Sequence, residues 1–136
     1  MKNFTKILTV FIVVFIFQSC SVSKEARVMK KTINGNWVLQ SITTEGINNV
    51  VKAKIFNEAE SGCFIGSTWN FIANNSMGSY TLVTQKKDCA VIKRFIRWSI
   101  YEPKGEQKKF QFKRLDDKKK PMDDNSGYRL SVIQLD

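Results

Sequence analysis

The strongest structural signal in the chain lies in one segment, Gly66-Ser67-Thr68-Trp69-Asn70-Phe71-Ile72-Ala73-Asn74-Asn75-Ser76-Met77-Gly78-Ser79-Tyr80-Thr81-Leu82-Val83. Aromatic and apolar residues alternate with polar ones on both sides of a turn rich in Asn and Gly. This alternation is typical of two half-buried antiparallel strands. Burial of one face selects the register that puts Trp69 and Phe71 on the same side as Tyr80 and Leu82. The segment therefore predicts a β-hairpin.

Further strands are expected before and after this hairpin. Turn residues separate four more runs of strand character, at 33–43, 90–101, 107–115 and 128–135. The segment 50–60 has apolar residues at helical spacing and predicts one short helix. Short antiparallel strands at regular spacing predict a single all-β domain, residues 33–136, that folds as a small up-and-down barrel.

The N-terminal residues have the layout of a secretory signal peptide. Lys2 and Lys6 precede an unbroken apolar run from Val10 to Phe17, and a small residue, Ser19, stands at a possible cleavage point. A membrane-spanning helix is the alternative, but it needs about 20 apolar residues and this run is shorter. We therefore expect residues 1–19 to be a cleaved signal peptide.

Cys20 follows this cleavage point directly. The run from Phe17 to Cys20 resembles the lipobox of bacterial lipoproteins, which implies cleavage before Cys20 and acylation of that cysteine. Ordinary secretion is the alternative. Residues 20–32 have mixed charges and no clear period, which predicts a flexible tether or a short helical turn at Glu25–Lys30. The expected location is the cell envelope, with a lipid anchor in the membrane.

The sequence contains three cysteines. Acylation of Cys20 leaves Cys63 and Cys89 as a pair that brackets the central hairpin, and an oxidising compartment favours a disulfide between them. They lack the close spacing of a redox-active pair. Two cysteines without a histidine make a poor metal site. We expect a structural disulfide and no metal or other cofactor.

Several motifs resemble one known family. Gly35-Asn36-Trp37 at the first strand resembles the G-x-W signature of lipocalins. The run Cys63 to Trp69, the turn Asn74 to Tyr80 and the terminal Gly127-Tyr128-Arg129-Leu130 extend the resemblance to the lipocalin-like domain of small bacterial envelope lipoproteins. The resemblance implies a barrel that closes at Gly35 and Trp37 and holds a small apolar or amphipathic ligand.

Candidate ligand-binding residues follow from the predicted register of the last long hairpin. A three-residue turn, Pro103–Gly105, pairs Trp98 with Phe110 and Ile96 with Phe112. Together with the central hairpin this wall gives the candidate set Trp69, Phe71, Tyr80, Arg94, Ile96, Trp98, Phe110, Phe112 and Arg114. The alternative is that these side chains simply fill a small barrel.

The same register sets Arg94 opposite Arg114. Like charges paired across strands are unfavourable, so we expect an anion between the two guanidinium groups. An amphipathic acid with its head at the barrel rim would supply it. Alternatively, both arginines reach solvent, pair with Asp88 or Asp116, or one stacks on Trp37.

The chain is strongly basic. It has 22 Lys and Arg against 12 Asp and Glu, a formal net charge of +10. Thirteen of the basic residues, with five acidic ones, lie between Lys86 and Lys120. This basic face either only solubilises the protein or attracts an anionic envelope polymer or anionic lipid. Export and the lack of a nucleic-acid-binding motif argue against nucleic acid as a partner.

Nothing in the sequence predicts catalysis. The chain has no histidine, which removes His-based triads and the commonest metal ligand. The Asp pairs at 116–117 and 123–124 stand in turn-forming sequence. We expect a binding protein and not an enzyme. The leading hypothesis is a lipid-anchored, lipocalin-like protein for an apolar or amphipathic ligand; the alternative is a cavity-free envelope interaction or structural protein that acts through its basic face.

Overall fold

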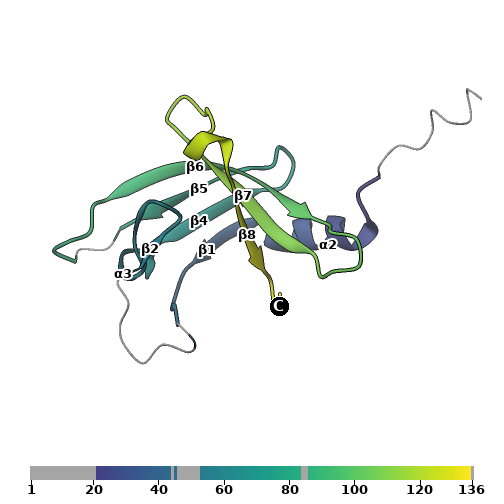
Figure 1. Cartoon of the computed structure of the whole chain (residues 1–136), viewed down its shortest axis with the longest axis horizontal. Coiled ribbons are helices and arrows are strands. Elements are labelled where there is room, and N and C mark those ends of the chain that lie inside the picture. Colours follow the sequence, from purple (N-terminus) through teal and green to yellow (C-terminus); the bar gives the residue numbers. More distant parts are fainter. Residues whose placement is uncertain (1–20, 44, 46–52, 84–85, 136) are drawn as a thin grey trace, which may run out of the picture.

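The computed structural model describes residues 21–43, 45, 53–83 and 86–135. Its main element is a six-stranded antiparallel sheet with strand order β1-β4-β5-β6-β7-β8, and the sheet is curved (Figure 1). Its strands are β1 Gly35–Val38, β4 Thr68–Ile72, β5 Met77–Leu82, β6 Ile92–Tyr101, β7 Lys109–Leu115 and β8 Tyr128–Ser131. The antiparallel, mostly β architecture predicted from the sequence is confirmed.

Smaller elements flank this sheet. They are helix α2 Lys24–Ile33, the short strands β2 Lys54–Ile55 and β3 Ala59–Glu60, helix α3 Ser61–Phe64 and the single turn η1 Asp123–Asn125. Figure 1 shows α2 at one end of the sheet and the β2–β3 pair with α3 toward the other end.

The central hairpin has the predicted register. Trp69 pairs with Tyr80 and Phe71 with Gly78, and Tyr80 and Leu82 are fully buried. Gly78 is required at its position, because a Cβ there would lie 2.4 Å from the backbone oxygen of Asn70. The alternation of burial along β5 therefore reproduces the pattern that the sequence shows.

The sheet does not close into the predicted barrel. β1 and β8 are its two edges, and each is only four residues long. The first strand was expected to continue to residue 43. Its pairing instead ends at Leu39, whose N–H donates to the carbonyl of Ser67 and whose carbonyl accepts from the N–H of Gly66, just before β4. The inner face is buried instead by Ile33 of α2, Phe64 of α3 and Phe56 of the β2–β3 turn. Because these segments cover the apolar face, further strands are not needed to bury it.

The helix predicted at 50–60 is wrong over its described part, 53–60. This part forms the β2–β3 hairpin, in which Ile55 pairs with Ala59. Phe56 and Asn57 both have left-handed backbone angles, with φ of 50° and 52°, and Glu58 N–H donates to the carbonyl of Ile55 at 3.0 Å. The apolar spacing that suggested a helix arises because this tight turn points Phe56 into the core. Residues 50–52 lie outside the described residues.

Residues 24–32, expected as part of a flexible tether or a short helical turn, form helix α2 together with Ile33, which was expected at the start of the first strand. The side chain of Ser23 caps the helix by accepting a hydrogen bond from the N–H of Ala26 at 3.1 Å. Ala26 and Ile33 are buried on its inward side. A helix of this length is marginal in isolation, so its N-cap and the packing of its inward side against the domain stabilise it.

The β6–β7 register differs from the predicted one by two residues. Trp98 pairs with Phe112, Ile100 with Phe110 and Ile96 with Arg114. The connection is therefore longer than Pro103–Gly105 and runs from residue 102 to residue 108, with Gly105 at a φ of +76°. A shift of two keeps every side chain on its predicted face. It also gives Ile100 an apolar partner in Phe110, whereas the shorter turn would place Ile100 opposite Lys108.

Candidate functional site

The predicted ligand-binding side chains do gather on the inner face of the sheet. Among the aromatic and apolar members of this set, the most deeply buried are Tyr80, Ile96, Trp98, Phe110 and Phe112, all 6% exposed or less. Phe71 is 9% exposed, and its ring centroid lies 5.5 Å from that of Trp98 and 5.4 Å from that of Phe110. Trp69 is half-buried and lies 4.6 Å from Tyr80, centroid to centroid. These residues form a packed aromatic cluster.

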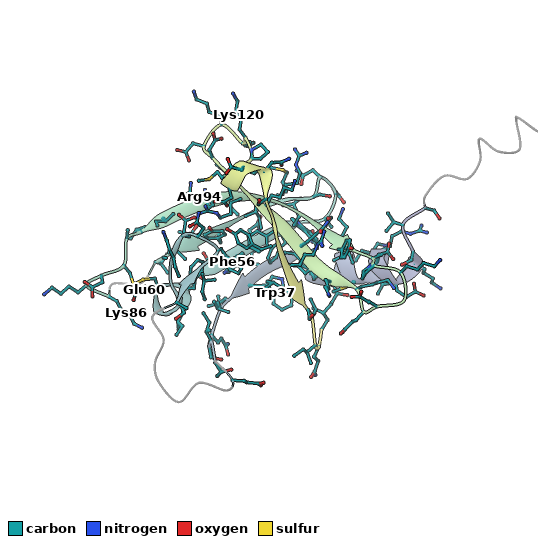
Figure 2. The ribbon with its side chains drawn as sticks, viewed as in Figure 1. Trp37, Phe56, Glu60, Lys86, Arg94 and Lys120 are labelled. Carbon is teal, nitrogen blue, oxygen red and sulfur yellow. A yellow bond between two sulfur atoms is a disulfide. The ribbon has the colours of Figure 1, made fainter. Side chains whose placement is uncertain are left out.

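Phe56 completes this cluster from the opposite side. Its ring meets four others edge-on, at centroid distances of 4.9 Å to Phe112, 5.1 Å to Tyr128, 5.6 Å to Phe64 and 6.1 Å to Trp69. In Figure 2, Phe56 lies in the body of the molecule, whereas Lys86 and Lys120 extend outward. The chain's own side chain thus occupies the space that the predicted ligand would use.

The carboxylate of Glu58 lies between Arg94 and Arg114. Arg94 donates twice, from Nε to Oε2 at 2.9 Å and from Nη2 to Oε1 at 2.8 Å. Arg114 Nη1 and the Tyr80 hydroxyl each donate to Oε2 at 2.7 Å. The arginines are not directly opposite, since Arg94 pairs with Tyr80 and Arg114 with Ile96. An anion does lie between them, and it is Glu58 of the same chain rather than Asp88 or Asp116.

Asp123 balances the second charge of this group. Arg114 donates from Nε to Asp123 Oδ2 at 2.7 Å and from Nη2 to Oδ1 at 2.5 Å. The side chains of Arg114, Glu58 and Asp123 are only 4%, 6% and 11% exposed. Arg94, Arg114, Glu58 and Asp123 thus form a buried charge cluster with two cations and two carboxylates.

The pKa values of the two acids keep this cluster ionised. Burial alone would raise the pKa of Glu58, but hydrogen bonds from Arg94, Tyr80 and Arg114 outweigh it and lower the pKa to about 2. The hydrogen bonds of Arg114 lower the pKa of Asp123 to about 2. Burial, together with Glu58, raises the pKa of the Tyr80 hydroxyl well above its usual range. The cluster is neutral as a whole and offers no uncompensated cation to an acidic ligand.

Sequence reasoning missed both Phe56 and Glu58 as partners of the inner face. The spacing of apolar residues assigned both to a helix, whereas in the structure both lie in the tight turn between β2 and β3. The signal that identifies the turn is Asn57, since Asn tolerates the left-handed conformation better than other non-glycine residues.

Gly35 and Trp37, predicted to close a barrel, join α2 to the sheet edge. Gly35 has a φ of +127° at the point where the chain leaves α2 and enters β1. Trp37 pairs with Trp69 across the strands, and its indole N–H donates to the carbonyl of Ile33 at 2.8 Å. Trp37 lies on the edge strand β1 and remains 41% exposed, so it stands outside the buried core.

The predicted disulfide is present. Cys63 and Cys89 are bonded, with their Cα atoms 5.5 Å apart. Cys63, in α3, belongs to the core, and Cys89 packs against it from the segment before β6. The bond therefore fixes α3 and the adjoining β2–β3 hairpin to the start of β6.

The outer face of the sheet carries a groove of about 1190 Å³. It is lined by parts of β6, β7 and β8, by the turn after β4 and by the loop that precedes β8. Four of its lining residues are cationic and none is acidic: Arg97, Lys113, Lys119 and Arg129. Ser99, Gln111, Asn125 and Ser126 add hydroxyl and amide groups. We call this surface the basic groove.

Arg97 and Lys113 face each other in the basic groove as a cross-strand pair. Lys113 Nζ donates to Asn125 Oδ1 at 2.8 Å. Arg97 makes no side-chain hydrogen bond or ion pair with any residue that the structure describes. Like charges directly opposite one another are unfavourable, and here, unlike at Arg94 and Arg114, no carboxylate of the described chain compensates them.

Aromatic rings on the outer face are covered by cations. Lys93 and Lys119 lie over Phe95, with Nζ 5.8 Å and 5.7 Å from the ring centroid. The guanidinium of Arg129 lies 3.8 Å from the centroid of Tyr101, while its Nε donates to Gln111 Oε1 at 3.1 Å. Both rings are thus half-buried and have a cation over them.

Within the described ranges, no cluster of three or more His, Cys, Asp or Glu could hold a metal ion. No helix in the same ranges is long and apolar enough to cross a membrane. Comparison of the chain with protein-family models, with curated proteins and with solved structures finds no match. The resemblance to lipocalin-like lipoproteins therefore stays a prediction.

Proposed function

We propose that the mature protein is anchored in the cell envelope through Cys20 and binds an anionic polymer of the envelope in the basic groove. The observation that supports this proposal is the composition of the groove, which combines four cationic side chains with amides and hydroxyls and contains no carboxylate. Such a set favours sulfate, phosphate or carboxylate groups, because charge-assisted hydrogen bonds to them are stronger than neutral ones.

The uncompensated pair Arg97 and Lys113 is the centre of the proposed site. An anionic group between them would relieve their repulsion and could accept a two-pronged hydrogen bond from the guanidinium. The neighbouring pair Ser99 and Gln111, whose side chains already bond to each other at 2.9 Å, would contact the next unit of a chain lying along the groove.

The inner face supports an apolar or amphipathic ligand less well. Such a ligand would have to displace Phe56 from its four ring contacts and Glu58 from its two arginines. Removing one partner from a buried ion pair costs about 3–5 kcal/mol. For this reason we favour the basic face, the alternative of the two functions that the sequence predicts.

The covered rings favour a carbohydrate-type polyanion over single-stranded nucleic acid. Nucleic-acid strands gain much of their affinity by stacking bases on open aromatic faces. Phe95 and Tyr101, the aromatic residues of the outer face, have cations over their rings. A sulfated or acidic sugar polymer needs the cations and does not need the rings.

Dextran sulfate and neutral dextran are suitable probes for the proposal. The purified mature protein should bind dextran sulfate, and its affinity should fall as salt increases, because binding releases counterions. Neutral dextran should not bind. Replacing the central cations in R97Q/K113Q/R129Q should weaken dextran sulfate binding by at least tenfold, since each lost charge-assisted hydrogen bond is worth about 1.5–3 kcal/mol.

A matched control removes three charges elsewhere. Lys54, Lys86 and Lys87 are exposed and lie outside the groove, so K54Q/K86Q/K87Q should retain the parent affinity apart from a small effect of net charge. Equal losses in the two triple variants would show that the polymer responds to total charge, and the proposed groove would be rejected.

A further inference from the structure

The outward side of α2 is a second basic surface, separate from the groove. Ala26 and Ile33 are buried on the inward side of the helix, and Lys30 also turns inward, with its Nζ 2.6 Å from Ser76 Oγ. Successive helical residues are about 100° apart, so the opposite side presents Lys24, Arg27, Val28 and Lys31. All four are exposed, Val28 to 56%. We call these four residues the outward face of α2.

This face has a fixed orientation relative to the sheet. The backbone N–H of Ser23 donates to Glu102 Oε2 at 3.3 Å, and Glu25 lies 3.8 Å from Lys108, oxygen to nitrogen. Lys30 also lies over the ring of Trp98, 5.6 Å from its centroid. Contacts near both ends of the helix thus hold the outward face in place, so the three cations point away from the domain together.

We infer that the outward face of α2 docks on the anionic surface of the membrane that holds the lipid anchor. This inference rests on the anchor in the proposed function. Lys24 is four residues after Cys20, so an extended chain separates them by at most about 14 Å. A lipid at Cys20 therefore keeps the helix within reach of the headgroups.

The composition of the face fits this partner. Lys and Arg near an anionic bilayer each improve binding by about fivefold, and exposed apolar side chains such as Val28 and Val22, which is 53% exposed, enter the headgroup boundary. The ratio of docked to undocked protein should therefore rise about a hundredfold through the combined charges of Lys24, Arg27 and Lys31. The docked helix would turn a flexible attachment at Cys20 into a defined orientation of the domain.

Two exposed valines at different ends of the molecule allow a direct test. Val28 lies on the outward face, whereas Val91 is 75% exposed and immediately precedes β6. The α2 helix packs on β6, whose ten residues span about 33 Å. Fluorescently labelled V28C and V91C proteins, processed by the cell and purified intact, are added to vesicles of phosphatidylcholine and phosphatidylglycerol with brominated acyl chains. Bromine quenches V28C and leaves V91C unquenched if the face is docked.

Charge variants complete the test. Adding K24Q/R27Q/K31Q to V28C, or omitting phosphatidylglycerol, should lower the docked-to-undocked ratio about a hundredfold, whereas adding K54Q/K86Q/K87Q should leave it near the parent value. Similar quenching of V28C and V91C, or quenching of V28C that does not respond to these charges, overturns the inference. Mass analysis of the same preparations tests the anchor separately: charge-dependent quenching of V28C in protein without acyl chains supports the docking face while rejecting the anchor.

Discussion

Replacing Glu58 by Gln should destabilise the protein strongly, because it leaves Arg94 and Arg114 buried without their shared anion. Glu58 accepts four hydrogen bonds and is 6% exposed. Its pKa falls from 4.5 to about 2, which corresponds to about 3–4 kcal/mol at about 1.4 kcal/mol per pKa unit. The general cost of breaking a buried ion pair, about 3–5 kcal/mol, agrees with this value. We expect E58Q to lose about 3–4 kcal/mol.

Chemical unfolding monitored by tryptophan fluorescence measures this loss. The matched control is E60Q, because Glu60 is an exposed carboxylate two residues away in β3 and should change the free energy of unfolding by less than about 0.5 kcal/mol. In a double-mutant cycle, E58Q and R94Q should be coupled by at least about 1 kcal/mol, since the residues are in contact. A stability of E58Q equal to that of E60Q, or additive effects in the cycle, would refute the role given to the buried charge cluster.

Three further predictions concern the remaining parts of the account. The C63S/C89S variant should unfold with about 3–4 kcal/mol less free energy, because the disulfide closes a loop with a sequence separation of 26; an unchanged denaturation midpoint in non-reducing urea would contradict this. The stability that Glu58 and Asp123 contribute should be fully present above pH about 4.5 and should fall as the pH drops toward 2, because the folded state lowers the pKa of both acids to about 2. Acid titration of E58Q should show a smaller loss of stability than the parent, and equal losses in parent and variant would count against this prediction. The C20A variant should lose its acyl chains and leave the membrane fraction of fractionated cells, whereas retention equal to that of the parent would reject the anchor.

The sequence predicted the parts of the fold that follow from local alternation. The central hairpin and the assignment of residues to the two sheet faces were correct, because side-chain period and burial determine them within a few residues. The predicted β6–β7 register was wrong by two residues. In the structure Ile100 pairs with Phe110, whereas the prediction paired Trp98 with Phe110. Both partners are apolar, so pairing rules alone do not distinguish the two registers.

Barrel closure and the inner-face partners could not be predicted in the same way. Whether the apolar face is covered by more strands or by α2 and the β2–β3 hairpin depends on contacts between residues far apart in sequence, such as Phe56 with Phe112 and Tyr128. The need for an anion near Arg94 and Arg114 was recognised from charge repulsion, but Glu58 reaches them only through a left-handed turn at Phe56 and Asn57. The basic groove was visible in the sequence only as an excess of Lys and Arg.

The most direct test of the proposed polymer site is an NMR titration of the isotope-labelled mature protein with short dextran sulfate chains. The account predicts that backbone amide shifts change along the basic groove, at Ser99, Gln111 and Gly127, while amides at the buried core positions Leu82 and Phe64 stay unchanged. Shift changes centred on those core residues, or spread evenly over every exposed lysine, would contradict the account.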